Sequence, residues 1–191
     1  MSRRATAIYA FFILIFGVFC YFAHRFAYFP GDLSTSLWLQ DIDFAGVKPI
    51  MQFIPYAIIL AIVIALKLWL PSRRRGAIFI ALTAFAAVLV SWLLKLLVNR
   101  PRPDIELVQI MERTIGSGFP SMHLAGVTVI CGFIFYLAPR LVRTPAVMWL
   151  LRALLIALIF FTGVSRIYLG AHWASDVVGG LFLGVCCSTR P

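Results

Sequence analysis

Apolar runs long enough to cross a lipid bilayer recur along this chain. A spanning helix needs about 20 mostly apolar residues, and runs of about 18 or more with few charges are typical of such helices. The composition agrees with this interpretation, because 62% of the 191 residues are hydrophobic and 13% are charged. We therefore expect an all-α integral membrane protein.

The apolar runs predict six transmembrane helices, each bounded by charge, Pro or Gly. The segment SLWLQDIDFAGV, after the first of them, is predicted to form a short interfacial helix. The sixth has about fourteen apolar residues before Ser188, so either it starts below the outer surface or the natural chain continues. No repeat or linker is apparent, and we expect a single domain over 1–191. The predicted spans are 6–28, 50–70, 76–98, 121–138, 146–164 and 174–187.

The first span follows two arginines, as the apolar part of a signal peptide would. It reaches about Tyr28, however, and no small-residue cleavage site follows, so we interpret it as an uncleaved anchor. With the N-terminus in the cytoplasm, the inner ends of the spans hold eight arginines and no carboxylate, while all seven Asp and Glu residues fall outside. This distribution agrees with the positive-inside rule.

Three polar clusters interrupt the apolar pattern: KLLVNRPRP (95–103), FPSMH (119–123) and SRIYLGAHWASD (165–176). A charge at bilayer depth costs roughly 2.5–3.5 kcal/mol, so ionisable residues beside spanning helices need a reason. The predicted topology places all three clusters on the extracytoplasmic face. Cations, histidines and a carboxylate gathered there indicate a site for an anionic group.

In the third cluster, His172 and Asp176 are four residues apart and would share a face of the sixth span. A carboxylate there accepts a hydrogen bond from one ring nitrogen and leaves the other free as a nucleophile or base. A pair that only caps a helix end fits the same spacing, and both interpretations stay open here. Arg166 adds a planar fork suited to phosphate oxygens.

The second cluster places Ser121 and His123 at the start of the fourth span, where free N–H groups and a partial positive charge favour an anion. Ser121 also fits an ordinary N-cap, which is compatible with anion binding. In the first cluster, Lys95 and Arg102 add two cations, and the flanking prolines would aim Arg102. Lys95 alone also fits a side chain that snorkels to headgroups, and Arg100 is interpreted as a further lipid-facing charge.

Together the clusters fit metal-free phosphoryl transfer, in which cations neutralise the phosphoryl oxygens, one histidine attacks and another protonates the leaving oxygen. No H-E-x-x-H motif, carboxylate cluster or Walker motif occurs, so neither a metal nor a cofactor is expected. The net charge of +10 is dispersed between apolar spans, so no nucleic-acid partner is expected. The four cysteines lie in apolar runs without C-x-x-C spacing, which predicts neither zinc nor disulfides.

This pattern resembles the type 2 phosphatidic acid phosphatases, membrane lipid phosphatases related to vanadium haloperoxidases and glucose-6-phosphatase. The family motifs are K-x6-R-P, P-S-G-H and S-R-x5-H-x3-D, in this order. Leu93, where a lysine would be needed, excludes a register of the first motif on Arg100. The matching positions are Lys95, Arg102 and Pro103, then Pro120, Ser121 and His123, then Ser165, Arg166, His172 and Asp176.

The resemblance implies a role for each matched residue. His172 would be the nucleophile that forms a phosphohistidine, Asp176 would orient it, and His123 would be the acid and later the base. Met122 departs from the family, which has glycine there; it can supply the same backbone N–H but would be strained if φ > 0 or close approach were required. The phosphate would be bound by Lys95, Arg102, Ser121, Met122 and Arg166.

The resemblance also implies the activity: a metal-independent hydrolase that removes phosphate from a membrane lipid in a bacterial inner membrane. Undecaprenyl pyrophosphate, phosphatidylglycerol phosphate and phosphatidic acid are equally compatible substrates, and the other partners are membrane lipids. A lipid-to-lipid phosphotransferase using the same site is an alternative. A non-catalytic lipid-binding or transport relative is disfavoured, because both histidines and the aspartate are present. The sequence makes no prediction of oligomeric state.

Overall fold

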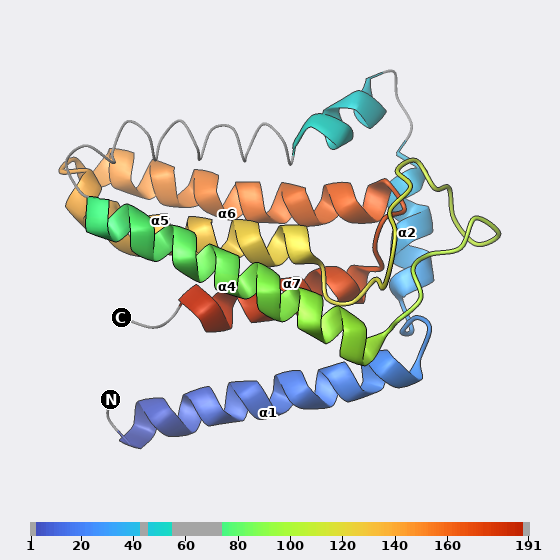
Figure 1. Cartoon of the computed structure of the whole chain (residues 1–191). Helices are drawn as coiled ribbons and strands as arrows, with labels where there is room; N and C mark the ends of the chain where they lie inside the picture. Colours follow the sequence, from blue (N-terminus) through green and yellow to red (C-terminus); the bar gives the residue numbers. More distant parts are fainter. Residues whose placement is uncertain (1–2, 43–45, 55–73, 189–191) are drawn as a thin grey trace.

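The computed structural model describes residues 3–42, 46–54 and 74–188, and every regular element in these segments is an α-helix (Figure 1). Residues 47–54 are also helical, and they contain the beginning of the predicted second span. The rest of that span, 55–70, lies outside the described residues. The helices are α1 (Arg3–Arg25), α2 (Asp32–Gln40), α4 (Arg74–Val98), α5 (Met122–Leu141), α6 (Pro145–Tyr168) and α7 (Ala174–Ser188).

Three of these helices are long and apolar enough to cross a membrane: Ala81–Val98, Met122–Leu141 and Pro145–Tyr168. The apolar parts of α1 (Tyr9–Arg25) and of α7 are shorter. Large apolar side chains cover the outside of the bundle; Phe85, for example, is 66% exposed and Leu97 is 74% exposed. Such a surface suits lipid rather than water. The described structure is therefore that of an all-helical membrane protein.

Helix α2 differs from the interfacial helix expected over 36–47. It begins at Asp32 and ends at Gln40, and it runs across one end of the bundle (Figure 1). Gly31 precedes it with φ +94°, a left-handed conformation that glycine adopts without steric cost. The predicted start is too late because the apolar pattern does not mark the polar Asp32, whose buried carboxylate is a structural anchor described below.

Helix α5 lies at the centre of the bundle and packs against α4, α6 and α7. Its contact with α7 is close because α7 presents glycines to it. A methyl group on Gly180 would collide with the Ser121 carbonyl, and one on Gly184 would come within 2.5 Å of Thr128 Cβ. The G-x-x-x-G match in α7 is thus a helix-packing face, as expected for such a motif in a membrane. This packing brings the first turns of α5 and α7 together.

Candidate active site

The three polar clusters meet at the end of the bundle that α2 crosses (Figure 1). Backbone hydrogen bonds join them directly: Ser121 donates its N–H to the Asp176 carbonyl at 2.9 Å, and Gly118 donates to the Arg100 carbonyl at 2.8 Å. The Arg102 guanidinium donates to the Ala171 carbonyl at 2.6 Å. Segments that are far apart in the sequence therefore form one site, as the motif analysis predicted.

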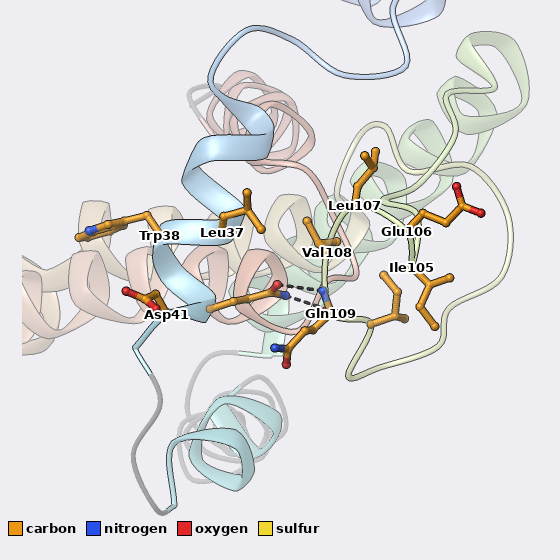
Figure 2. Close-up of a pocket in the computed structure, with 10 residues that line it drawn as sticks. Leu37, Trp38, Asp41, Ile105, Glu106, Leu107, Val108 and Gln109 are labelled. Carbon is orange, nitrogen blue, oxygen red and sulfur yellow. Dashed lines mark hydrogen bonds between the residues drawn. The ribbon is translucent and has the colours of Figure 1, made fainter.

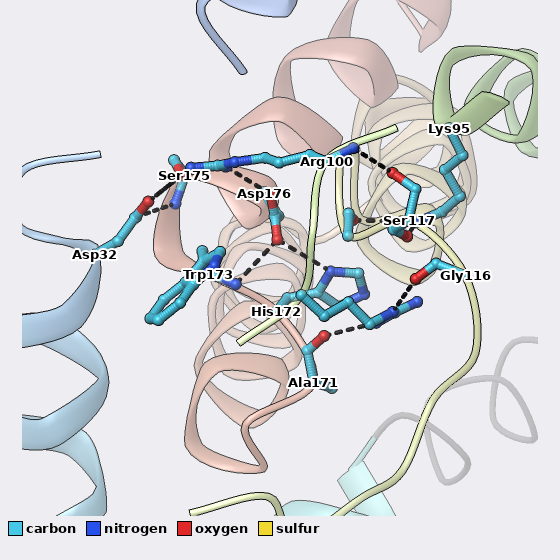
Figure 3. Close-up of polar contacts among 12 residues, drawn as sticks. Asp32, Lys95, Arg100, Gly116, Ser117, Ala171, His172, Trp173, Ser175 and Asp176 are labelled. Atoms are coloured by element: carbon cyan, nitrogen blue, oxygen red, sulfur yellow. Dashed lines mark hydrogen bonds and ion pairs between the residues drawn. The ribbon is translucent and has the colours of Figure 1, made fainter. Parts of the chain in front are cut away.

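His172 lies in the bend just before α7 and Asp176 lies in the first turn of α7, so the two residues do not share a helix face as their spacing predicted, yet they lie side by side (Figure 3). His172 Nδ1 lies 3.5 Å from Asp176 Oδ2, which is longer than an ordinary hydrogen bond, and this buried nitrogen has no other hydrogen-bond partner among the described residues. The same oxygen accepts the Trp173 N–H at 3.0 Å, which fixes the carboxylate beside the ring. Catalytic hydrogen bonds are often long in a free enzyme and shorten when the substrate binds.

Burial lowers the pKa of His172 to about 4, although the neighbouring carboxylate of Asp176 opposes this change. The side chain is almost wholly buried, at 3% exposure, and water therefore stabilises its charged form poorly. The nearby charges of Arg102 and Lys95 also lower the pKa. At neutral pH the imidazole is uncharged and carries a free electron pair, which a nucleophile requires.

The N-terminus of α5 lies beside this pair. Ser121 is the N-cap residue, with extended backbone at φ −69° and ψ 106°, yet its side chain makes no capping hydrogen bond. Its Oγ is buried and has no hydrogen-bond partner. The first N–H groups of a helix also lack intrahelical partners. This end of α5 thus offers donors to an anion, and the exposed side chain of His123 lies on the same first turn.

Met122 is the first residue of α5, and its backbone is unstrained. Among the described residues other than glycine, only Asn99 has a positive φ. A left-handed backbone is therefore not required where the family motif has glycine. The methionine places its N–H in the first helical turn as a glycine would.

Lys95 and Arg102 enclose the loop that approaches α5. Lys95 Nζ donates to the carbonyls of Ser117 and Gly118 at 2.6 and 3.0 Å, and Arg102 Nε donates to the Gly116 carbonyl at 2.8 Å. Burial lowers the pKa of Arg102, and the carboxylates of Asp176 and Glu112 oppose this change. The two predicted phosphate ligands thus hold the segment 116–118, the glycine loop, by hydrogen bonds to its carbonyls. Figure 3 shows Lys95 beside Gly116 and Ser117.

Arg166 extends from the end of α6 and is 2% exposed. Its Nη1 pairs with Glu112 Oε1 at 2.9 Å, while its buried Nη2 has no hydrogen-bond partner. A buried donor of this kind is costly unless a ligand satisfies it. Arg166 Nη2 and Ser121 Oγ are therefore two orphaned groups at one site, and a phosphate, which has several acceptor oxygens, suits both.

Three residues that the motif analysis did not select also belong to this region: Asp32, Arg100 and Glu112. The interpretation of Arg100 as a lipid-facing charge is wrong, because its side chain is fully buried and ion-paired to Asp32 and Asp176. The family register had excluded it from the phosphate-binding motif. A signal existed, since an arginine beside apolar spans needs carboxylate partners, and few carboxylates are available in this chain.

A hollow of about 810 Å³ lies between α2 and the loop 105–110 (Figure 2). One wall is α2, with Leu37 and Trp38, and its C-cap Asp41; the other wall is the loop 105–110. Gln40 joins the walls by exchanging hydrogen bonds with the backbone of Gln109, at 2.8 and 3.0 Å. None of the predicted phosphate-binding or catalytic residues lines this hollow.

The chain resembles known proteins both in sequence and in fold. The family model described as the PAP2 superfamily matches residues 75–190, which include all three clusters. Undecaprenyl-diphosphatase BcrC of Bacillus subtilis is 29% identical over 71% of this chain and 68% of its own length. The putative undecaprenyl-diphosphatase YbjG of Escherichia coli is 28% identical over 82% of this chain and 75% of its own. Phosphatidylglycerophosphatase B of B. subtilis is 34% identical over 51% of this chain and 47% of its own length.

Two solved structures have a similar fold. The PAP2-type phosphatidylglycerolphosphate phosphatase of B. subtilis superposes with a TM-score of 0.80 over 94% of this chain and 92% of its own, at 22% identity. LpxE of Aquifex aeolicus superposes with a TM-score of 0.62 over 82% of this chain and 92% of its own, also at 22% identity. Both likenesses concern the fold.

Proposed function

This chain belongs to the PAP2 superfamily, and we propose that it is a membrane phosphatase that removes phosphate from a lipid phosphate or pyrophosphate through a phosphohistidine. The observation that carries the proposal is the buried, neutral His172 beside two orphaned donors, Ser121 Oγ and Arg166 Nη2. The names of the relatives support the reaction class, since they are phosphatases of isoprenoid and glycerol lipids.

In the proposed first step, His172 attacks the phosphorus in line and the bond between phosphorus and the leaving oxygen breaks. Asp176 orients the ring by accepting the Nδ1–H, and it stabilises the positive charge that develops on the imidazole. Lys95, Arg102 and Arg166, with the N-terminus of α5, neutralise the phosphoryl oxygens. His123 donates its proton to the leaving oxygen.

In the second step, water attacks the phosphohistidine. His123, now neutral, takes a proton from this water, the phosphorus–nitrogen bond breaks, and phosphate leaves. If the hydroxyl of a second lipid replaced water, the same site would transfer phosphate between lipids. We favour hydrolysis, because the relatives that match over most of the chain are diphosphatases by name.

We further propose six spans in a bacterial inner membrane, with the N-terminus in the cytoplasm and the site facing outward. A cysteine at Ile115, which is fully exposed near the site, should react with a membrane-impermeant maleimide added outside cells. A cysteine at Arg143, between α5 and α6, is the matched control and should react only after the membrane is opened. Native cysteines would first be replaced by serine. Labelling of both positions from one side would contradict the topology.

The function is tested with purified protein in detergent and four substrates: an isoprenoid pyrophosphate, phosphatidylglycerol phosphate, phosphatidate and lipid A. We expect phosphate release, with one substrate preferred in kcat/KM, and mass spectrometry of the lipids distinguishes release from lipid-to-lipid transfer. Transfer without release would favour the phosphotransferase. If the protein neither releases nor transfers phosphate with any of the four substrates, the proposal is contradicted.

A further inference from the structure

A buried chain of charges links α2 to the first turn of α7 (Figure 3). Arg100 lies at its centre, with 0% exposure. Its Nη1 lies 2.7 Å from Asp176 Oδ1 and its Nη2 lies 3.0 Å from Asp32 Oδ2. The guanidinium also donates to the Phe26 carbonyl at 3.2 Å and lies 4.8 Å from the centre of the Phe29 ring. Contacts on all sides therefore hold it in place.

This arrangement divides the two oxygens of Asp176 between two tasks. Oδ1 accepts from Arg100, while Oδ2 accepts the Trp173 N–H at 3.0 Å and faces His172 Nδ1 at 3.5 Å. A carboxylate can rotate about its last bond, so contact with the histidine alone would not fix its plane. The hydrogen bond from Arg100 to Oδ1 is a second contact, and it fixes the plane of the carboxylate.

Asp32 holds the other end of Arg100 and also the start of α7. Its Oδ1 accepts the Ser175 N–H at 2.8 Å, so the first residue of α2 caps α7 from outside that helix. Its Oδ2 accepts the Ser175 hydroxyl at 2.6 Å, and that hydroxyl in turn accepts from Arg100 Nη1 at 2.7 Å. The turn that carries Asp176 is thus fixed from both sides.

From this geometry we infer that Arg100 is a positioning residue, held by Asp32, which aims the Asp176 carboxylate at His172 and so sets the rate of the chemical step. This inference rests on the proposed function, because it assigns Arg100 a part in orienting the nucleophile. Arg100 does not bind the phosphate in this account, since four of its five N–H donors are taken by the two aspartates, Ser175 and a backbone carbonyl.

A buried ion pair is weak evidence for stability, because desolvation offsets much of the attraction. Its loss from a site that positions a nucleophile, by contrast, changes the reaction rate. Residues that orient metal ligands in metalloenzymes are typically worth about 10- to 100-fold in metal affinity or activity, and a 1 Å misplacement of a reacting group can cost about 100-fold. We expect a decrease of this size in kcat when a substitution removes the charge and the planar guanidinium of Arg100.

The test is a double-mutant cycle with Arg100→Gln, Asp176→Asn and the double variant. The substrate for kcat and KM is whichever of the four lipids above gives the highest kcat/KM in detergent, and inorganic phosphate is the probe for binding by calorimetry. Arg100→Gln should lower kcat about 10- to 100-fold and leave KM and phosphate affinity within about 3-fold. In the Asp176→Asn background the same change should have little further effect, because Arg100 acts through Asp176. Arg113→Gln removes an exposed arginine from the same loop and should leave kcat unchanged.

Three results would overturn the inference. They are an unchanged kcat in Arg100→Gln, a kcat in the double variant that is lowered by the product of the two single effects, or a phosphate affinity that falls as much as kcat. If Arg100→Gln is not recovered as a monodisperse protein, Arg100→Lys enters the cycle under the same criteria, because lysine keeps the charge but cannot reach both aspartates as a fork. A wild-type protein that is inactive on all four lipids would overturn the proposed function and this inference with it. An active wild type with an equally active Arg100→Gln overturns the inference alone.

Discussion

Gly118 faces Asp176 so closely that a Cβ atom on the glycine would lie 2.8 Å from the carboxylate Oδ2. Asp176 is fully buried and its other oxygen is held by Arg100, so the carboxylate cannot move aside freely. The glycine loop and the His172–Asp176 pair are therefore fitted to each other.

Gly118→Ala should consequently lower kcat by about 10- to 100-fold, because the methyl group displaces Oδ2 from its position beside His172. Gly126→Ala in α5 is the matched control, since its Cβ would meet only Val88 Cγ2 at 3.8 Å. Initial rates of phosphate release from the preferred lipid measure both. Equal rates in Gly118→Ala and the wild type would mean that Asp176 does not need its present position.

His172→Ala should abolish turnover and leave the protein folded, because it removes the atom that bonds to phosphorus rather than a packing group. The wild type, quenched with alkali during turnover of a radiolabelled lipid, should carry label that acid releases, as phosphohistidine does. His172→Ala should carry none. Gel filtration and thermal unfolding check that the variant is intact, and phosphatase activity retained by it would exclude His172 as the nucleophile.

The pH dependence of kcat/KM should reflect the lowered pKa of His172. Because this pKa is about 4 rather than near 6.5, the imidazole stays neutral as the pH falls through 6, and nucleophilic attack is lost only near pH 4. Lipid phosphates titrate near pH 6 themselves. A phosphorothioate analogue, which ionises at lower pH, would shift a limb set by the substrate but not one set by His172. An acid limb that stays near 6.5 with both substrates would contradict this prediction.

Chelation should leave the activity essentially unchanged. Among the described residues, no group of three or more His, Cys, Asp or Glu side chains is arranged to hold a metal, and the positive charges of Lys95, Arg102 and Arg166 are suited to the role that a metal would have on the phosphate. Activity is measured after dialysis against EDTA, with dialysis alone as the control. Loss of activity that Mg²⁺ restores would show that the mechanism needs a metal.

Much of this fold follows from apolar patterning alone. The starts and ends of α4, α5 and α6 lie close to charge or proline in the sequence, and lipid requires each apolar run to be helical. Helix α2 was misplaced because its first residue, Asp32, is polar but buried. The hydrophobic pattern describes contact with lipid and carries no information about which polar residues find partners inside.

The same distinction separates the predicted from the unpredicted parts of the site. His172 and Asp176 are recognisable from their spacing in the motif, although they are not a helical pair, because His172 lies in the bend before α7, which begins at Ala174. The partnership of Arg100 with Asp32 joins residues 68 positions apart, and it depends on how α2 crosses the end of the bundle. Such a contact is set by tertiary packing, so motif spacing does not reveal it.

Met122 provides the last prediction, because it stands where the family motif has glycine. Its backbone is that of a first helical residue without positive φ, and all residue types except proline supply the same N–H there. Met122→Gly should therefore leave kcat within about 3-fold of the wild type and lower stability by no more than about 1 kcal/mol, through the greater freedom of glycine in the unfolded chain. Met122→Ala is the matched control, since it shortens the side chain without adding that freedom. A large gain in kcat/KM in both variants would show that the methionine side chain restricts the headgroup, and a gain in Met122→Gly alone would show that the site needs a backbone that methionine resists.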